Sequence, residues 1–138
     1  MALDPKKLEK SFVKLRKLVR KMSKRATQDE VHDLRTNTRR VEATLQALQL
    51  NRSQEGRHVL RAVTPMRKKA GDVRDMDVLT GFAAGLACKG DEQCLVKLLE
   101  HLGQERGRGA RKLRKTGRNR GDPSQAGHRL SARWCAEI

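Results

Sequence analysis

Hydrophobic side chains recur every three or four residues along most of the first 115 positions, which is the spacing of one face of an α-helix. Two of these runs begin with a capping signal. Asp4 stands before the first run, and Thr27 stands three residues before Glu30, the spacing of a capping box. We therefore predict helices over 5–22 and 28–50. Their expected core positions are Leu8, Phe12, Leu15, Val19, Met22, Val31, Leu34, Val41, Leu45 and Leu48.

Three further helices are predicted over 55–70, 72–87 and 91–115. Pro65 is expected to kink or split the first of them, because proline lacks the N–H that an interior helical turn requires. Gly71 is expected to end it. No stretch of useful length alternates as a strand would. The predicted fold class is therefore all-α, an antiparallel bundle of four to five helices.

The helical periodicity fails after Thr116, where glycine, proline and serine become frequent. Such a composition is typical of segments that do not pack into a core. We expect residues 1–116 to form one helical domain and residues 117–138 to be a disordered basic tail.

The charge balance is the strongest compositional signal, with 32 Lys and Arg against 16 Asp and Glu and a formal net charge of +16. Self-repulsion of this size calls for an anionic partner such as nucleic acid, an acidic membrane surface or a phosphate polymer. The only aromatic residues are Phe12, Phe82 and Trp134. Because binders of single-stranded nucleic acid stack bases on aromatic side chains, a polyanion without bases fits this chain better.

The cysteines Cys88, Cys94 and Cys135 are odd in number and lack the paired spacing of a zinc site, so a reducing compartment suits them best. No signal peptide and no run of about 20 apolar residues is present. We therefore expect a cytoplasmic protein with no transmembrane segment and no cofactor.

The segment predicted as a helix over 28–50 carries a cationic stripe roughly opposite its apolar one. At 100° per residue, one face gathers the side chains His32, Arg35, Thr36, Arg39 and Arg40, with no acid among them. Guanidinium groups suit phosphate because each can donate two parallel hydrogen bonds to its oxygens. A merely solvated basic face is the open alternative, and for His32 so is a structural hydrogen bond.

A second polar cluster lies around residues 71–79. We expect Asp75 and Asp77 to pair with arginines of the 28–50 helix and to hold them in position. Two other roles stay open for these carboxylates: contact with Mg²⁺ or Ca²⁺, or a helix cap with a structural ion pair.

Together the two segments resemble the N-terminal half of a CHAD domain, the conserved histidine α-helical domain. The resemblance rests on His32, Arg35 and the Arg39–Arg40 pair, followed by Gly71-x-x-Arg74-Asp75-x-Asp77, and covers roughly residues 5–115. It implies antiparallel helices around a basic groove, binding of inorganic polyphosphate, and association with polyphosphate granules. Metal chelation by the histidines is an older and lesser view of the family.

The resemblance carries over residue by residue. His32, Arg35, Arg39 and Arg40 match the first basic motif, and Arg74, Asp75 and Asp77 match the second. Lys68 and Lys69 stand where the family also carries basic residues. Three lysines of the 5–22 helix are added on charge alone: Lys14, Lys17 and Lys21. An anionic membrane surface is a weaker interpretation of that helix.

The sequence departs from the family in one respect, since residues 118–138 do not resemble the expected second half. One hypothesis is that two chains pair as a homodimer to replace it. The predicted function is polyphosphate binding, with non-specific nucleic-acid binding as the alternative. We expect no enzymatic activity and no metal site, because no P-loop, no H-E-x-x-H motif and no placeable nucleophile–base pair occurs in the sequence.

Overall fold

The computed structural model describes residues 5–86, 90, 92–119, 129–130 and 132. These residues form four packed α-helices and one short 3₁₀ helix, without strands. The predicted all-α class is confirmed. The helices are α1 (Pro5–Lys21), α2 (Gln28–Ala47), η1 (Leu50–Arg52), α3 (Gln54–Gly85) and α4 (Glu92–Asn119).

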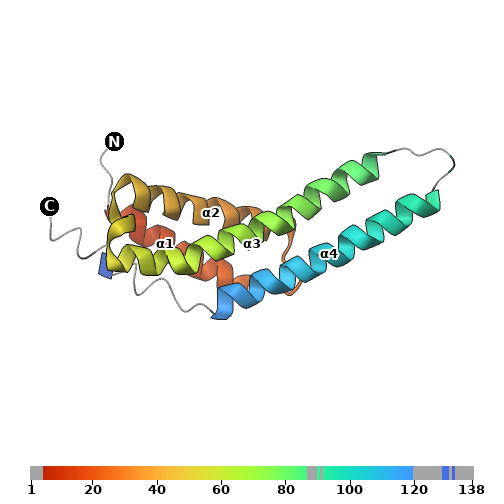
Figure 1. The fold of residues 1–138 in the computed structure, drawn as a ribbon. Helices are drawn as coiled ribbons and strands as arrows, with labels where there is room; N and C mark the ends of the chain where they lie inside the picture. The colour runs from red at the N-terminus through yellow and green to blue at the C-terminus, as the bar shows by residue number, and fades with distance from the viewer. Residues whose placement is uncertain (1–4, 87–89, 91, 120–128, 131, 133–138) are drawn as a thin grey trace.

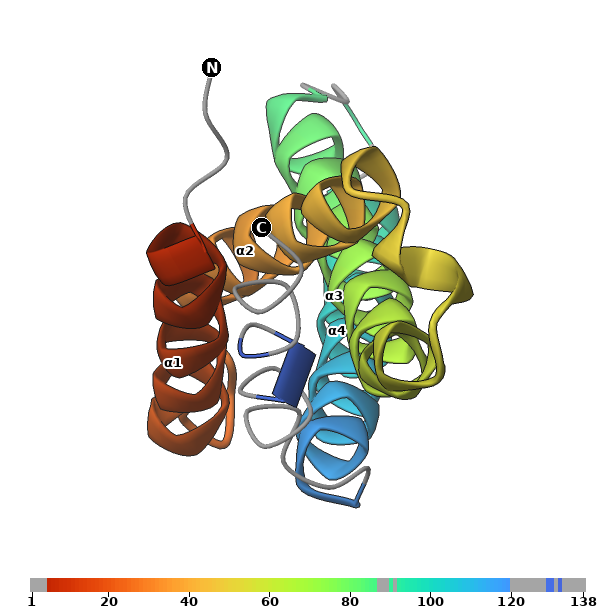
Figure 2. The ribbon, with the colours of Figure 1, turned by 90° about the vertical axis from the view of Figure 1, so that its left-hand side faces the viewer.

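The two long helices α3 and α4 run antiparallel as a hairpin, and α1 and α2 pack against one end of it (Figure 1). The other end of the hairpin extends beyond the layer formed by α1 and α2 (Figure 1). Viewed from the end, α2 crosses between α1 and the hairpin (Figure 2). Helix α1 packs on α2 and touches α4 only slightly.

The buried core contains most of the positions expected from the apolar periodicity. Val19 and Leu48 are only partly buried and pack against its edge. Leu130 is fully buried in the same cluster, and the short segment that carries it lies between α1 and α4 in the end view (Figure 2). The fully buried large side chains include Phe12, Leu15, Leu34, Leu45, Met66, Leu113 and Leu130.

Helix α2 starts at the predicted cap, but the capping box is only half formed. The Thr27 hydroxyl accepts a hydrogen bond from the backbone N–H of Glu30 at 3.3 Å. The Glu30 carboxylate does not return to Thr27; it accepts from the backbone N–H and hydroxyl of Ser23 at 3.0 and 3.1 Å. This arrangement ties the turn after α1 to the first turn of α2. The helix ends at Ala47, three residues earlier than expected, because Gln49 adopts the left-handed conformation at φ 57°.

The prediction of two helices over 55–70 and 72–87 was wrong, because α3 continues through both Pro65 and Gly71. A proline inside a helix costs roughly 3 kcal/mol and a glycine about 1 kcal/mol. Tertiary packing outweighs these penalties here, since one buried stripe runs past both residues. Its members are Val59, Ala62, Val63, Met66, Ala70 and Val73. The same stripe contributes to the contacts of α3 with α2 and α4.

Helix α4 is also longer than expected and runs to Asn119 through four glycines. Residues 117–119 therefore belong to a helix, and the burial of Leu130 brings part of the expected tail into the core. The rest of the 117–138 segment lies outside the described residues, apart from Arg129 and Ala132, which are exposed.

Candidate functional site

Two neighbouring hollows between α2 and α3 bring the two sequence motifs together. The larger, of about 540 Å³, places Arg35 of α2 beside Lys68 and Lys69 of α3. The smaller, of about 160 Å³, places His32 of α2 beside Arg74 of α3. His32 and Arg35 are one helical turn apart, so the hollows follow one another along α2. We call these five residues and their hollows the α2–α3 surface.

The arginines of α2 differ in how they lie. Arg35 is half-buried and lines the larger hollow, whereas Arg39 and Arg40 are exposed and line neither hollow. Among the described residues, no carboxylate forms an ion pair with any of these three arginines. Their guanidinium groups are therefore open to an anion from outside.

A buried polar residue fixes the orientation of this stripe. Asn37 lies on α2 between the cationic residues Arg35 and Arg39 in the sequence, but it is buried. Its side-chain amide donates a hydrogen bond to the backbone carbonyl of Ser11 at 3.1 Å. Thr38 is buried as well and donates to the carbonyl of Arg35 at 2.9 Å. The amide of Asn37 thereby joins α1 to α2 and holds the arginines on the outward side.

One cation that lines the larger hollow is already neutralised within the protein. Arg67 Nε lies 2.6 Å from Glu42 Oε2, an ion pair whose N–H direction departs from an aligned hydrogen bond. The other oxygen of Glu42 accepts from the Thr64 hydroxyl at 2.7 Å. These contacts tie α2 to α3, so we assign Arg67 to structure rather than to ligand binding.

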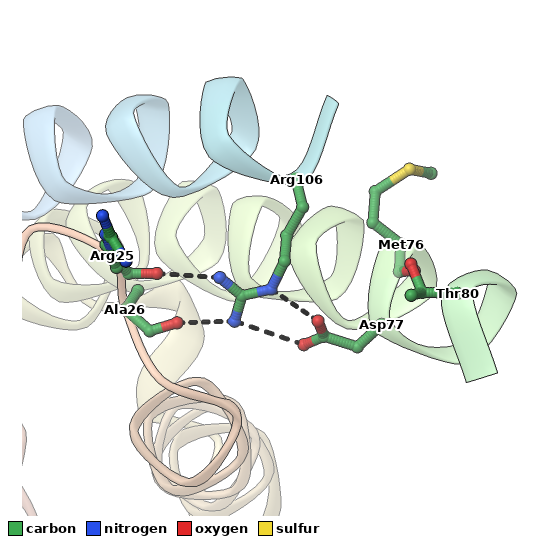
Figure 3. A network of polar contacts seen from close by, with 6 residues as sticks. All are labelled: Arg25, Ala26, Met76, Asp77, Thr80 and Arg106. Carbon is green, nitrogen blue, oxygen red and sulfur yellow. Dashed lines mark hydrogen bonds and ion pairs between the residues drawn. The ribbon is translucent and has the colours of Figure 1, made fainter. Parts of the chain in front are cut away.

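The sequence suggested that Asp77 pairs with an arginine of α2, but the structure does not show this pair. Its partner is Arg106 of α4, with Nε 2.5 Å from Oδ1 and Nη2 3.4 Å from Oδ2 (Figure 3). The same guanidinium donates to the carbonyl oxygens of Arg25 at 2.8 Å and Ala26 at 2.6 Å (Figure 3). Arg106 therefore joins α3, α4 and the turn after α1.

The orienting role expected of Asp75 is not supported by any contact in the described part of the chain. Asp75 is exposed and lines the larger hollow together with Asp72. The four cations of that hollow thus share it with two carboxylates, which lowers its net positive charge.

The three lysines predicted from charge alone lie away from the α2–α3 surface. Lys14 and Lys17 line a shallow hollow formed only by α1, together with Glu9. Lys21 is exposed at the end of α1. The structure does not bring these lysines into contact with the two hollows described above.

Another cationic hollow was not expected from the sequence. It has a volume of about 710 Å³ and lies between α4 and the turn after α1. We call it the α4 cleft; its lining residues are Lys24, Arg25, Gly103, Arg106, Gly107, Ala110, Arg111, Arg114, Lys115 and Arg118. A signal was present, since most of these α4 positions share one helical face, although Gly103 and Gly107 weaken a helix locally.

Other candidate chemistry is sparse in the described residues. They contain no group of three or more His, Cys, Asp or Glu side chains placed to hold a metal ion. Cys94 is an exposed free thiol, while Cys88 and Cys135 lie outside the described residues. None of the helices described has the length and apolar character needed to span a membrane.

Comparison with known proteins agrees with the motifs. Searches of curated proteins and of solved structures each found no match. Residues 7–131 match the family model described as the CHAD domain, which extends past the 5–115 span of the resemblance and includes the buried Leu130. Because this match covers most of the 138 residues, the chain belongs to the CHAD domain family.

Proposed function

We propose that this protein binds inorganic polyphosphate through the α2–α3 surface. The observation that carries the proposal is the meeting of both motifs there, with His32 and Arg35 of α2 beside Lys68, Lys69 and Arg74 of α3. Arg39 and Arg40 extend the line of cations along α2. A linear anion with a charge on every unit matches a row of guanidinium and ammonium groups.

The aromatic residues favour a ligand without bases. Phe12 is buried in the core, and Phe82 is exposed but lines none of the cationic hollows among the described residues. Stacking on aromatic rings supplies about 1–3 kcal/mol per base in single-strand binders. Trp134 lies outside the described residues, so within the described part of the chain these hollows offer the bases of nucleic acid, the alternative ligand, no aromatic ring to stack on.

The proposed role is binding without catalysis, in the cytoplasm and, where a cell stores polyphosphate, on its granules. The proposal includes self-association as a homodimer. Support for it comes from the projecting ends of α3 and α4, where large apolar side chains are exposed. These are Leu79, Phe82, Leu86, Val96 and Leu98. Such a group on a protein surface is typical of a contact with another chain.

The test is a competition experiment over a salt series. The protein is bound to immobilised polyphosphate and challenged with free polyphosphate, duplex DNA, RNA and heparin of matched charge concentration. We expect polyphosphate to compete best at every salt concentration. Arg35→Ala and Arg39→Ala should each weaken polyphosphate binding by about 1–3 kcal/mol, as expected for the loss of charged hydrogen bonds.

Arg52→Ala is the matched control, because Arg52 is an exposed arginine of η1 that lines none of the hollows described above. It removes the same charge and should change the affinity by less than about twofold. Equal effects of all three substitutions would contradict a localised site. Better competition by DNA or RNA would favour the alternative ligand.

A further inference from the structure

We propose that the α4 cleft is a second phosphate-binding site, distinct from the α2–α3 surface, which takes a short and multiply charged oligophosphate. This proposal goes beyond the function proposed above and does not depend on it. The volume of the α4 cleft, about 710 Å³, falls within the ~300–1,000 Å³ range of small-molecule sites.

The charge of the cleft is of one sign only. Seven of its lining residues are Lys or Arg, and none is Asp or Glu: Lys24, Arg25, Arg106, Arg111, Arg114, Lys115 and Arg118. The larger hollow of the α2–α3 surface, in contrast, has four cations and two carboxylates. A concave surface with one sign of charge concentrates the field and attracts small anions more strongly than a flat face does.

The floor of the cleft is formed by two glycines and an alanine, whose small size leaves the space above them empty. Gly103, Gly107 and Ala110 lie about one turn apart along α4. A Cβ atom added at Gly103 would meet no atom within 4 Å, and one at Gly107 would meet only Arg111 Nη1, at 3.7 Å. The long cationic side chains therefore stand around a space that no other described group fills.

One wall of the cleft is fixed in place. Arg106 is held by the Asp77 carboxylate and by the carbonyl oxygens of Arg25 and Ala26. Its hydrogen-bonding capacity is largely used, so we assign Arg106 to positioning rather than to ligand contact. It anchors the turn that carries Lys24 and Arg25 against α4, and this anchoring limits the rearrangement needed on binding.

The cations of the cleft wall differ in exposure: Arg111 and Arg118 are exposed, whereas Arg114 is half-buried. Its Nε atom is buried and has no hydrogen-bond partner among the described residues. Solvent does not reach this atom, and neither would a phosphate oxygen of similar size, so Arg114 contributes its positive charge to the cleft rather than this donor. Guanidinium groups such as those of Arg111 and Arg118 can each donate two parallel hydrogen bonds to the same phosphate.

Titration calorimetry of the full chain with inorganic tripolyphosphate tests this site. Two variants address it: the double substitution Arg111→Gln with Arg118→Gln, which removes charge, and Gly103→Leu, which fills the floor and keeps every cation. We expect each to weaken tripolyphosphate binding by about tenfold or more, since charged hydrogen bonds are lost or blocked. Gly103→Leu should keep the thermal stability, because the added side chain enters open space.

The control is the double substitution Arg52→Gln with Arg57→Gln, which removes the same charge from two exposed arginines that line none of the hollows described above. It should leave tripolyphosphate affinity within about twofold of the unmodified protein. The proposal is overturned if tripolyphosphate does not bind, if both α4 variants bind it normally, or if the control variant loses as much affinity as they do. A chain that binds tripolyphosphate in the cleft but fails to bind long polyphosphate would refute the function proposed above and leave this site standing.

Discussion

Arg106 of α4 holds both carboxylate oxygens of Asp77 of α3, and its remaining N–H groups reach two backbone carbonyls in the turn after α1 (Figure 3). The two side chains are 21% and 15% exposed, so solvent screens the pair only in part. A single side chain thereby connects three segments that lie 29 to 81 residues apart in the sequence. Asp77 also lines the smaller hollow and Arg106 the α4 cleft, so the pair lies between the two cationic regions.

Substitution of Asp77 should destabilise the fold. Asp77→Ala leaves the Arg106 guanidinium partly buried without its carboxylate, and we expect a loss of about 2–4 kcal/mol in the free energy of unfolding. Urea denaturation followed by circular dichroism measures it. Asp75→Ala removes the same charge two residues earlier from an exposed position and should cost less than about 0.5 kcal/mol. Equal losses from both variants would show that the Asp77–Arg106 pair has no special role.

Two glycines of α3 should respond to alanine in opposite directions. A Cβ at Gly81 would meet no atom within 4 Å, so Gly81→Ala should stabilise the helix by about 0.5–1 kcal/mol. A Cβ at Gly56 would lie 1.8 Å from the Leu50 carbonyl oxygen, so Gly56→Ala must displace backbone and should cost at least about 2 kcal/mol. Thermal unfolding of both variants provides the comparison; a stabilising Gly56→Ala would mean that the Leu50 carbonyl does not lie against Gly56.

Polyphosphate binding should weaken steeply with salt, because each contact between a cation and a phosphate releases a counterion. The logarithm of the association constant should fall linearly with the logarithm of salt concentration. Arg35→Ala and Arg39→Ala should each reduce the magnitude of that slope by about one, while Arg52→Ala should leave it unchanged. Fluorescence anisotropy with labelled polyphosphate gives the slopes, and a slope unaffected by all three changes would place the ligand elsewhere.

The homodimer makes a separate prediction about the projecting end of the hairpin. Phe82 is 72% exposed, and Phe82→Glu should convert a dimer into a monomer because a carboxylate replaces an apolar contact. Light scattering after size-exclusion chromatography measures the mass. Val13→Glu, a comparable change at an exposed apolar residue of α1, should leave the dimer intact. An unmodified chain that is monomeric at all concentrations would eliminate the dimer.

The sequence predicted the features that local chemistry dictates. The apolar stripe of α2 and its Thr27 cap could be predicted from the sequence, because helical periodicity and capping depend on nearby residues. The breaks expected at Pro65 and Gly71 did not occur, since packing of α3 on α2 and α4 is stronger than local propensity. That packing involves residues distant in the sequence, and no local pattern reports it.

The candidate site divides in the same way. The cationic stripe of α2 followed from residue spacing, and Lys68 was named from the resemblance to the family; its place beside Arg35 comes from the structure. The partner of Asp77 could not be predicted in this way, because Arg106 lies 29 residues away in the sequence, on another helix. The α4 cleft was missed for a related reason: Gly103 weakens a helix in isolation, yet within the packed hairpin it leaves room for a ligand.

Because α3 is uninterrupted, it fixes the distances between the residues along its axis. At about 1.5 Å per residue its 32 residues span about 48 Å, and Arg74 and Phe82 lie about 12 Å apart along the axis. An unbroken rod keeps this spacing whatever binds at either place. Phosphates held near Arg74 would therefore sit at the margin of any second chain seated on Phe82. Phosphate bound near Arg74 would therefore affect the binding of a second chain at Phe82, and the reverse, through electrostatic interaction and direct contact, without a conformational change of the protein.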